Sequence, residues 1–140
     1  MWKNIVVGVD DEDSSTRALE RAADIARMSH AALVVASITP ALVGMAAAHG
    51  VGPYDPADPP EAHRDELRHA REFLAEMKVP ARFELGLGEP AEQIVALAER
   101  HAADLIVVGT REPDFLERLI SGSVSQAVAR KAHCDVLIVH

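Results

Sequence analysis

The chain has 140 residues, the length of one ordinary domain, and such a chain can bury roughly two-thirds of its unfolded surface without metals or disulfides. Hydrophobic residues make up 49% and aromatic residues only 4%, so the core must consist of Ala, Val, Leu and Ile, as where helices pack on a sheet. The net charge of −8 argues against DNA or RNA as the main partner, because nucleic-acid binding needs a basic surface.

A few features of the sequence indicate the cellular compartment, and they agree with one another. The single Cys134 precedes an apolar run and is expected to be a buried, unreactive thiol. The apolar stretch near the start is interrupted by Gly8 and Asp10, so we expect no export signal. No apolar run approaches the roughly 20 residues that cross a bilayer, so the sequence predicts a cytoplasmic protein that does not span a membrane.

The first third of the chain has the pattern of strand, helix and strand. Residues 4–10 and 32–38 are apolar runs without alternation, which indicates strands buried on both faces. Between them, apolar residues recur at helical spacing from the caps at 13–15 to about Met28. From 39 to 60 the periodicity stops and glycines and prolines accumulate, so we predict a mobile insertion, with a short helical turn at 41–48.

The remaining segments continue the alternation of helices and strands. We expect helices over 61–78, from Pro90 to about His101, and over 123–131, and strands over 82–87, 105–109 and 135–140. Five strands alternating with four helices predict a single α/β domain over 1–140, a three-layer open parallel sheet rather than a barrel, which needs about eight such units. Ligands of such sheets bind beyond the carboxyl ends of the strands, where the strand order reverses.

Polar and glycine-rich segments follow the first and fourth expected strands. Asp10 begins an acidic run after the first strand, Gly109-Thr110-Arg111 follows the fourth, and Gly122-Ser123 precedes the last helix. Glycines allow backbone N–H groups to approach a phosphate, and a helix N-terminus adds partial positive charge. The pattern is typical of an anion cradle, although the same residues are also typical of a plain turn and helix cap.

The residues of three segments resemble the universal stress protein family. These segments are Lys3 to Asp10, Asp104 to Arg111, and Gly122 to Val139. The resemblance covers nearly the whole chain and implies a five-stranded Rossmann-like sheet of order 3-2-1-4-5. In some branches of the family it also implies adenine-nucleotide binding through the motif Gly, two residues, Gly, nine residues, Gly-Ser.

This chain departs from the family motif at two positions. Gly109, Gly122 and Ser123 occupy the first and last places at the correct spacing, but Glu112 stands where the middle glycine belongs. Asp11 likewise replaces the glycine that commonly follows Asp10. A carboxylate at either position repels a phosphate, so the alternative to nucleotide binding is a dimeric interaction module that binds no nucleotide.

The resemblance defines the expected site and its ligand. ATP or AMP is expected between the ends of strands one and four, with Mg²⁺ as a candidate bridge from carboxylates to phosphates. The nucleoside is expected at Asp10, Ile38 and Thr39, and the phosphates at Gly109, Thr110, Arg111, Gly122, Ser123 and Val124. Such a protein acts as a stress-response sensor and not as an enzyme, since no Walker lysine or other catalytic group accompanies the site.

Two other classes of site are weaker matches. The acidic run after the first strand is similar to a receiver domain, but Gly109 stands where the phosphate acceptor belongs and the last strand supplies no lysine. A metal site is not expected, because His63 and His69 are six residues apart and therefore lie on nearly opposite faces of one helix.

The last strand carries the expected partner surface. Val136, Leu137, Ile138 and Val139 form an apolar run that the family's strand order places at the edge of the sheet. An unpaired edge is a template for another strand. Members of the family commonly pair this strand antiparallel with its copy, so we predict a two-fold homodimer; the alternative is a short edge strand covered by the last helix.

Overall fold

The computed structural model describes residues 1–10, 13–40, 60–110 and 124–140. Several predictions concern positions outside the described residues: most of the insertion predicted over 39–60 with its helical turn, and the roles of Asp11, Arg111, Glu112, Gly122 and Ser123. The two ends of that insertion were wrong, because Thr39 belongs to β2 and Pro60 to α3. The fold below rests on the described residues alone.

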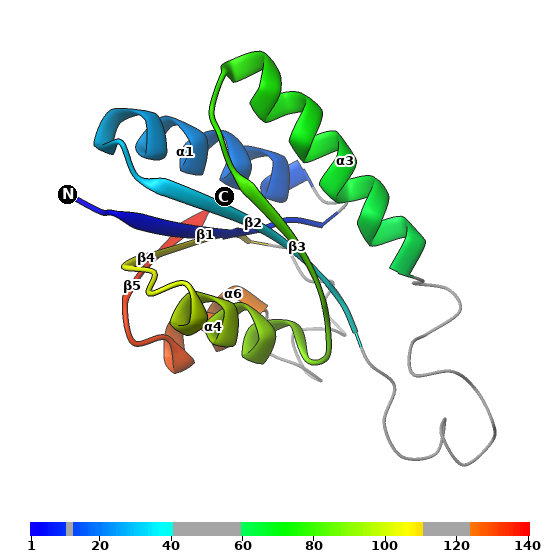
Figure 1. Cartoon of the computed structure of the whole chain (residues 1–140). Helices are drawn as coiled ribbons and strands as arrows, with labels where there is room; N and C mark the ends of the chain where they lie inside the picture. Colours follow the sequence, from blue (N-terminus) through cyan, green and yellow to red (C-terminus); the bar gives the residue numbers. More distant parts are fainter. Residues whose placement is uncertain (11–12, 41–59, 111–123) are drawn as a thin grey trace, which may run out of the picture.

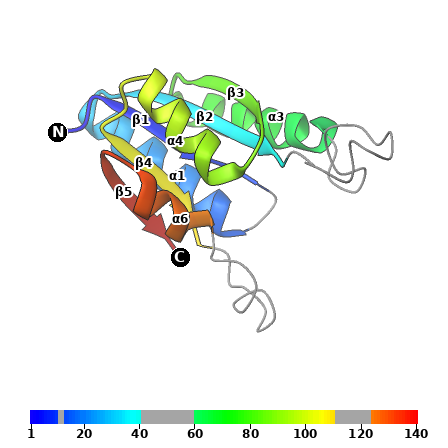
Figure 2. The same cartoon turned by 90° about the horizontal axis from the view of Figure 1, so that it is seen from below.

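Five strands and four helices alternate along the described residues (Figure 1). They are β1 (Asn4–Gly8), α1 (Asp13–Ser29), β2 (Ala32–Thr39), α3 (Pro60–Met77), β3 (Arg82–Leu87), α4 (Pro90–Arg100), β4 (Leu105–Gly109), α6 (Val124–Lys131) and β5 (Asp135–Val139). Helices α1 and α3 cover one face of the sheet, and α4 and α6 cover the other (Figures 1 and 2). The predicted three-layer α/β architecture is therefore confirmed.

The sheet has the strand order β3-β2-β1-β4-β5, and every neighbouring pair is parallel. Both the order 3-2-1-4-5 and the parallel arrangement were expected, and β3 and β5 are the two edges. The first strand is shorter than predicted, because the N–H of Asp10 donates to the Ser15 side chain and not to the sheet. The second strand is one residue longer, because Thr39 still pairs with Leu87 of β3.

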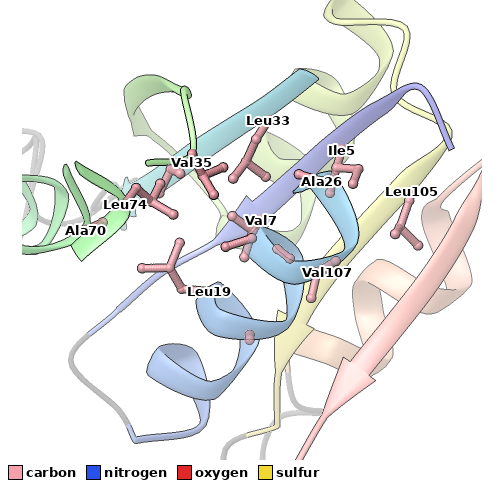
Figure 3. Close-up of a cluster of buried hydrophobic side chains, with 14 of the residues drawn as sticks. Ile5, Val7, Leu19, Ala26, Leu33, Val35, Ala70, Leu74, Leu105 and Val107 are labelled. Carbon is pink, nitrogen blue, oxygen red and sulfur yellow. The ribbon is translucent and has the colours of Figure 1, made fainter. Parts of the chain in front are cut away.

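Two apolar cores lie on the two faces of the sheet. Successive residues of β1 point to opposite faces, so Ile5 and Val7 belong to the core under α1 and α3, while Val6 belongs to the core under α4 and α6. All three side chains are fully buried. Figure 3 shows the first core, in which Leu19 of α1 and Leu74 of α3 pack on the sheet. The expected burial of β1 on both faces is confirmed.

The carboxylate of Asp104 joins the amino ends of the two inner strands β1 and β4. It accepts hydrogen bonds from the backbone N–H of Lys3 at 2.9 and 3.1 Å and from that of Asn4 at 3.0 Å. Desolvation opposes ionisation of this carboxyl group, but the backbone donors outweigh it and lower the pKa of Asp104. The ionised group thus joins the amino ends of β1 and β4.

We expect Asp104→Asn to lower stability in a pH-dependent way. A lowered folded-state pKa contributes stability above the ordinary pKa, and this stability is lost as the pH falls through the folded-state pKa. The variant should therefore show a lower urea midpoint than the natural chain at about pH 7, and the difference should shrink toward about pH 2. Asp24→Asn, which removes only an exposed ion pair with Arg27, is the control; a difference that is independent of pH would contradict this role of Asp104.

In the described part of the chain, no helix combines the length and the apolar character needed to cross a membrane.

Candidate functional site

Most of the expected ligand-binding residues that the structure describes lie at the carboxyl ends of three neighbouring strands, β1, β2 and β4. Asp10 follows β1, Ile38 and Thr39 end β2, and Gly109 and Thr110 end β4. The register joins the three strands, since Gly8 pairs with Ala36 and Val7 pairs with Val107. The strand order reverses between β1 and β4, and open α/β sheets bind ligands beyond the carboxyl ends of the strands at such a reversal.

Asp10 is exposed at the turn from β1 into α1. Its backbone N–H donates to Ser15 Oγ at 2.8 Å, so the first turn of α1 fixes the backbone of this residue. Ser15 itself is buried. Asp10 therefore lies exposed beyond the carboxyl end of β1, which is where the sequence predicts it.

Gly109 has a packing role that the sequence analysis left open. A Cβ at this position would lie 2.6 Å from both the C and the O atoms of the Ser14 backbone and 2.8 Å from Ser14 Oγ. Real Cβ atoms do not approach backbone atoms this closely, so only glycine allows α1 to lie against the end of β4. The need for glycine is thus explained without a phosphate.

Thr110 differs from the expectation for an anion cradle. Its backbone N–H donates to the carbonyl oxygen of Val139 at 2.8 Å, which extends the pairing of β4 with β5. This N–H is therefore not available to a phosphate, and only the half-buried side chain can contribute. Val124 begins α6 and is 42% exposed, so it remains accessible at this edge.

The two residues at the end of β2 point to opposite faces of the sheet. The Ile38 side chain is buried in the core under α4 and α6, so it contributes packing there and can offer a ligand only its backbone. Thr39 is 1% exposed, and its Oγ1 has no hydrogen-bond partner among the atoms that the structure describes. A buried hydroxyl without a partner is costly, so Thr39 Oγ1 calls for an explanation.

A buried polar cluster beside Thr39 was missed by the sequence analysis. It consists of Ser37 on β2 and His63 and Glu66 on α3, and we call it the Ser37–His63–Glu66 cluster. Ser37 Oγ lies 2.5 Å from Glu66 Oε2 and 2.8 Å from His63 Nδ1, and the latter two atoms are 2.9 Å apart. Ser37 is 0% and His63 5% exposed. Burial raises the pKa of Glu66, and the charge of Asp10 adds to this, while hydrogen bonds from Ser37 and the charge of His63 oppose it.

A sequence signal for this cluster existed in the periodicity of α3. The apolar stripe of Leu67, Ala70 and Leu74 continues backward to position 63 at helical spacing. A histidine on the buried face of a helix needs a polar partner, and Ser37 within the buried strand is such a partner. In the sequence, His63 was considered only as a candidate metal ligand and rejected as one, so this pairing was missed. Within the described residues, no group of three or more His, Cys, Asp or Glu side chains could hold a metal ion.

The sheet is parallel, and polar residues follow its strands at the point where the strand order reverses. These features define a doubly wound, Rossmann-like α/β protein. The model of the universal stress protein family matches residues 1–140, and the chain belongs to this family. It is 35% identical to a universal stress protein of Methanocaldococcus jannaschii, with 99% of this chain and 82% of the relative covered. It is 32% identical to the universal stress protein YxiE of Bacillus subtilis, with 99% of each chain covered.

Solved structures of the family have the same fold. A universal stress protein in complex with cAMP matches with a TM-score of 0.77 and 30% identity, covering 99% of this chain and 97% of its own. The universal stress protein of Archaeoglobus fulgidus in complex with dAMP matches with a TM-score of 0.76 and 26% identity, covering 99% of this chain and 98% of its own.

Proposed function

We propose that this protein binds an adenine nucleotide, ATP or AMP, at the carboxyl ends of β1, β2 and β4. Asp10 and the end of β2 hold the nucleoside. Gly109, the Thr110 side chain and Val124 hold the phosphates, together with Arg111, Gly122 and Ser123 of the sequence motif, and Mg²⁺ is a candidate companion of ATP. The cAMP and dAMP complexes of similar proteins support this ligand class.

The observation that carries the proposal is the orphaned hydroxyl of Thr39. Buried polar groups are almost always hydrogen-bonded, and an exception calls for an explanation. Thr39 Oγ1 is buried without a partner in the described part of the chain, two residues from Ser37 and on the same face of β2. A nucleoside at this edge offers ring nitrogens and hydroxyl groups that satisfy such an atom.

We expect Thr39→Val to change stability and affinity in opposite directions. Without ligand, the isosteric valine removes a buried unsatisfied hydroxyl, so the free energy of unfolding should rise by roughly 1 kcal/mol. With ligand, one hydrogen bond is lost, so the dissociation constant for ATP or AMP should increase about fivefold. Thermal unfolding and calorimetry measure the two effects, with Thr16→Val on the exposed face of α1 as the control. Unchanged affinity would contradict the role of Thr39.

We further propose that the protein is a cytoplasmic stress-response sensor and not an enzyme. The Ser37–His63–Glu66 cluster has the residue types of a nucleophilic triad, but both Ser37 and Glu66 contact the same ring nitrogen, Nδ1. A catalytic triad uses the two ring nitrogens separately.

We propose that β5 pairs with its copy to form a two-fold homodimer. It pairs only with β4 among the described strands. The carbonyl of Val139 points to β4, because it accepts from Thr110, and in a parallel strand alternate residues point the other way. Val136 and Ile138 therefore present their N–H and C=O groups to the open edge, where an antiparallel copy can pair.

Ile138→Pro is expected to convert the dimer into a monomer, since proline removes an outward N–H while edge strands tolerate it. Sedimentation equilibrium measures the change, and circular dichroism verifies the fold. Ile138→Val keeps the N–H and is the matched control. A natural chain that is monomeric at every concentration would contradict pairing through β5.

A second candidate function, a dimeric interaction module that binds no nucleotide, has two observations in its favour. The N–H of Thr110 is used by the sheet, and Gly109 is required by the packing of α1, so neither feature depends on a phosphate. Glu112 stands at a glycine position of the motif. A nucleotide titration separates the two functions.

A further inference from the structure

The Ser37–His63–Glu66 cluster lies at the edge of the proposed nucleotide site. Ser37 and Thr39 alternate with Ile38 along β2 and point to the α3 face, where the other buried residues of that strand are apolar. The charge of Asp10 acts on Glu66, which places the cluster within electrostatic reach of the residue expected to hold the nucleoside. A buried titratable group at such a position is a candidate for a functional role.

The cluster can take up one proton without moving its heavy atoms. With Glu66 ionised and the His63 ring carrying its single proton on Nδ1, the Ser37 hydroxyl and the His63 Nδ1–H both donate to the carboxylate. With Glu66 protonated, its O–H donates to Ser37 Oγ, and the Ser37 hydroxyl donates to an unprotonated Nδ1 while the ring proton lies on Nε2. The same three interatomic distances serve both arrangements. The geometry therefore fits a group that changes its charge inside the folded protein.

The surroundings of Glu66 favour the neutral form, and two described residues oppose this effect. Burial is the largest influence and raises its pKa, and Asp10 beyond β1 raises it further. The opposing groups are Ser37 of β2 and His63 of its own helix. A new negative charge nearby would therefore raise the pKa of Glu66 and favour its protonated form.

We propose that Glu66 is a proton-linked positioning residue of the nucleotide site, so that nucleotide binding takes up a proton and becomes tighter as the pH falls. This inference rests on the proposed nucleotide function. The bound nucleotide adds negative charge, and its hydroxyl groups hold Asp10 in the ionised form; both effects favour neutral Glu66. By linkage, a group whose pKa rises on binding gives higher affinity below that pKa than above it.

The test is calorimetric titration of the full chain with ATP and Mg²⁺ across a range of pH, in two buffers of different ionisation enthalpy. The buffer difference measures proton uptake. In the natural chain we expect uptake of part of a proton and an affinity gain of about tenfold for each unit by which the pKa of Glu66 rises on binding. Glu66→Gln imitates the protonated acid, so it should bind at the low-pH affinity throughout and show less uptake. Glu72→Gln, at an exposed position of the same helix, should behave like the natural chain.

Ser37→Ala supplies an independent arm if Glu66→Gln folds poorly. It removes the hydrogen bond that lowers the pKa of Glu66, so the range of tight binding should extend to higher pH. A Glu66→Gln protein with the natural pH profile and natural proton uptake, or a Ser37→Ala protein whose profile does not move, would overturn the inference while nucleotide binding stands. If ATP binds to no variant at any pH, the proposed function fails, and this inference fails with it.

Discussion

Replacing Gly109 with alanine should destabilise the protein by about 3 kcal/mol, the upper part of the range for overpacking a closely packed interior. The new Cβ would lie 2.6 Å from the C and O atoms of the Ser14 backbone, and backbone atoms of α1 cannot move aside as the end of a side chain can. The helix must shift away from β4, which disturbs the core beneath it. Urea unfolding measures the effect.

Gly8→Ala is the matched control for this prediction, because Gly8 ends β1 as Gly109 ends β4. There the nearest atom to the added Cβ would be Ile94 Cδ1 at 3.0 Å, the far end of a flexible side chain, and the next atoms lie at ordinary contact distances of 3.7 and 3.8 Å. We expect a cost below about 1 kcal/mol, as for tolerated repacking. Equal effects of the two substitutions would contradict the close approach of α1 to Gly109.

Leu74→Ala should cost about 3 kcal/mol, within the range for truncating a buried leucine. Leu74 is 1% exposed and packs α3 on the sheet beside Val35 (Figure 3). The same helix carries His63 and Glu66, so a loosened α3 should also disturb the Ser37–His63–Glu66 cluster. Chemical denaturation of both proteins gives the difference in unfolding free energy.

Leu87→Ala is the comparison for this substitution, since Leu87 on edge strand β3 is 46% exposed. Truncating a half-exposed leucine leaves no cavity, so the loss should stay below about 1 kcal/mol. A cost for Leu74→Ala as small as that for Leu87→Ala would show that α3 is only loosely attached to the sheet.

The helices and strands of the fold were predictable because each segment has its own pattern of apolar residues. Unbroken apolar runs such as residues 105–109 indicate strands buried on both faces, and the stripe from Leu67 to Leu74 indicates a helix. The strand order needed the resemblance to the family, since periodicity carries no information on which strands are neighbours. Element ends were less predictable, because they depend on single hydrogen bonds such as that from Asp10 to Ser15.

The sequence could predict which candidate site residues come together, but not their contacts. Parallel strands bring Asp10, Thr39 and Gly109 together at their carboxyl ends, and this follows from topology alone. The use of the Thr110 N–H by β5 and the contact between Gly109 and α1 are tertiary interactions that no local pattern encodes. The Ser37–His63–Glu66 cluster joins residues on two elements, and its helical half could be read from the stripe of α3.

The central claim is that an adenine nucleotide binds at the edge formed by β1, β2 and β4, despite the neighbouring acids. Calorimetric titration of the natural chain with ATP and AMP, each with and without Mg²⁺, tests it most directly. We expect a saturable isotherm for at least one nucleotide, weakened by Thr39→Val. No binding heat under all four conditions, together with affinity that appears only after Glu112→Gly, would contradict the claim and identify the chain as a non-binding member of its family.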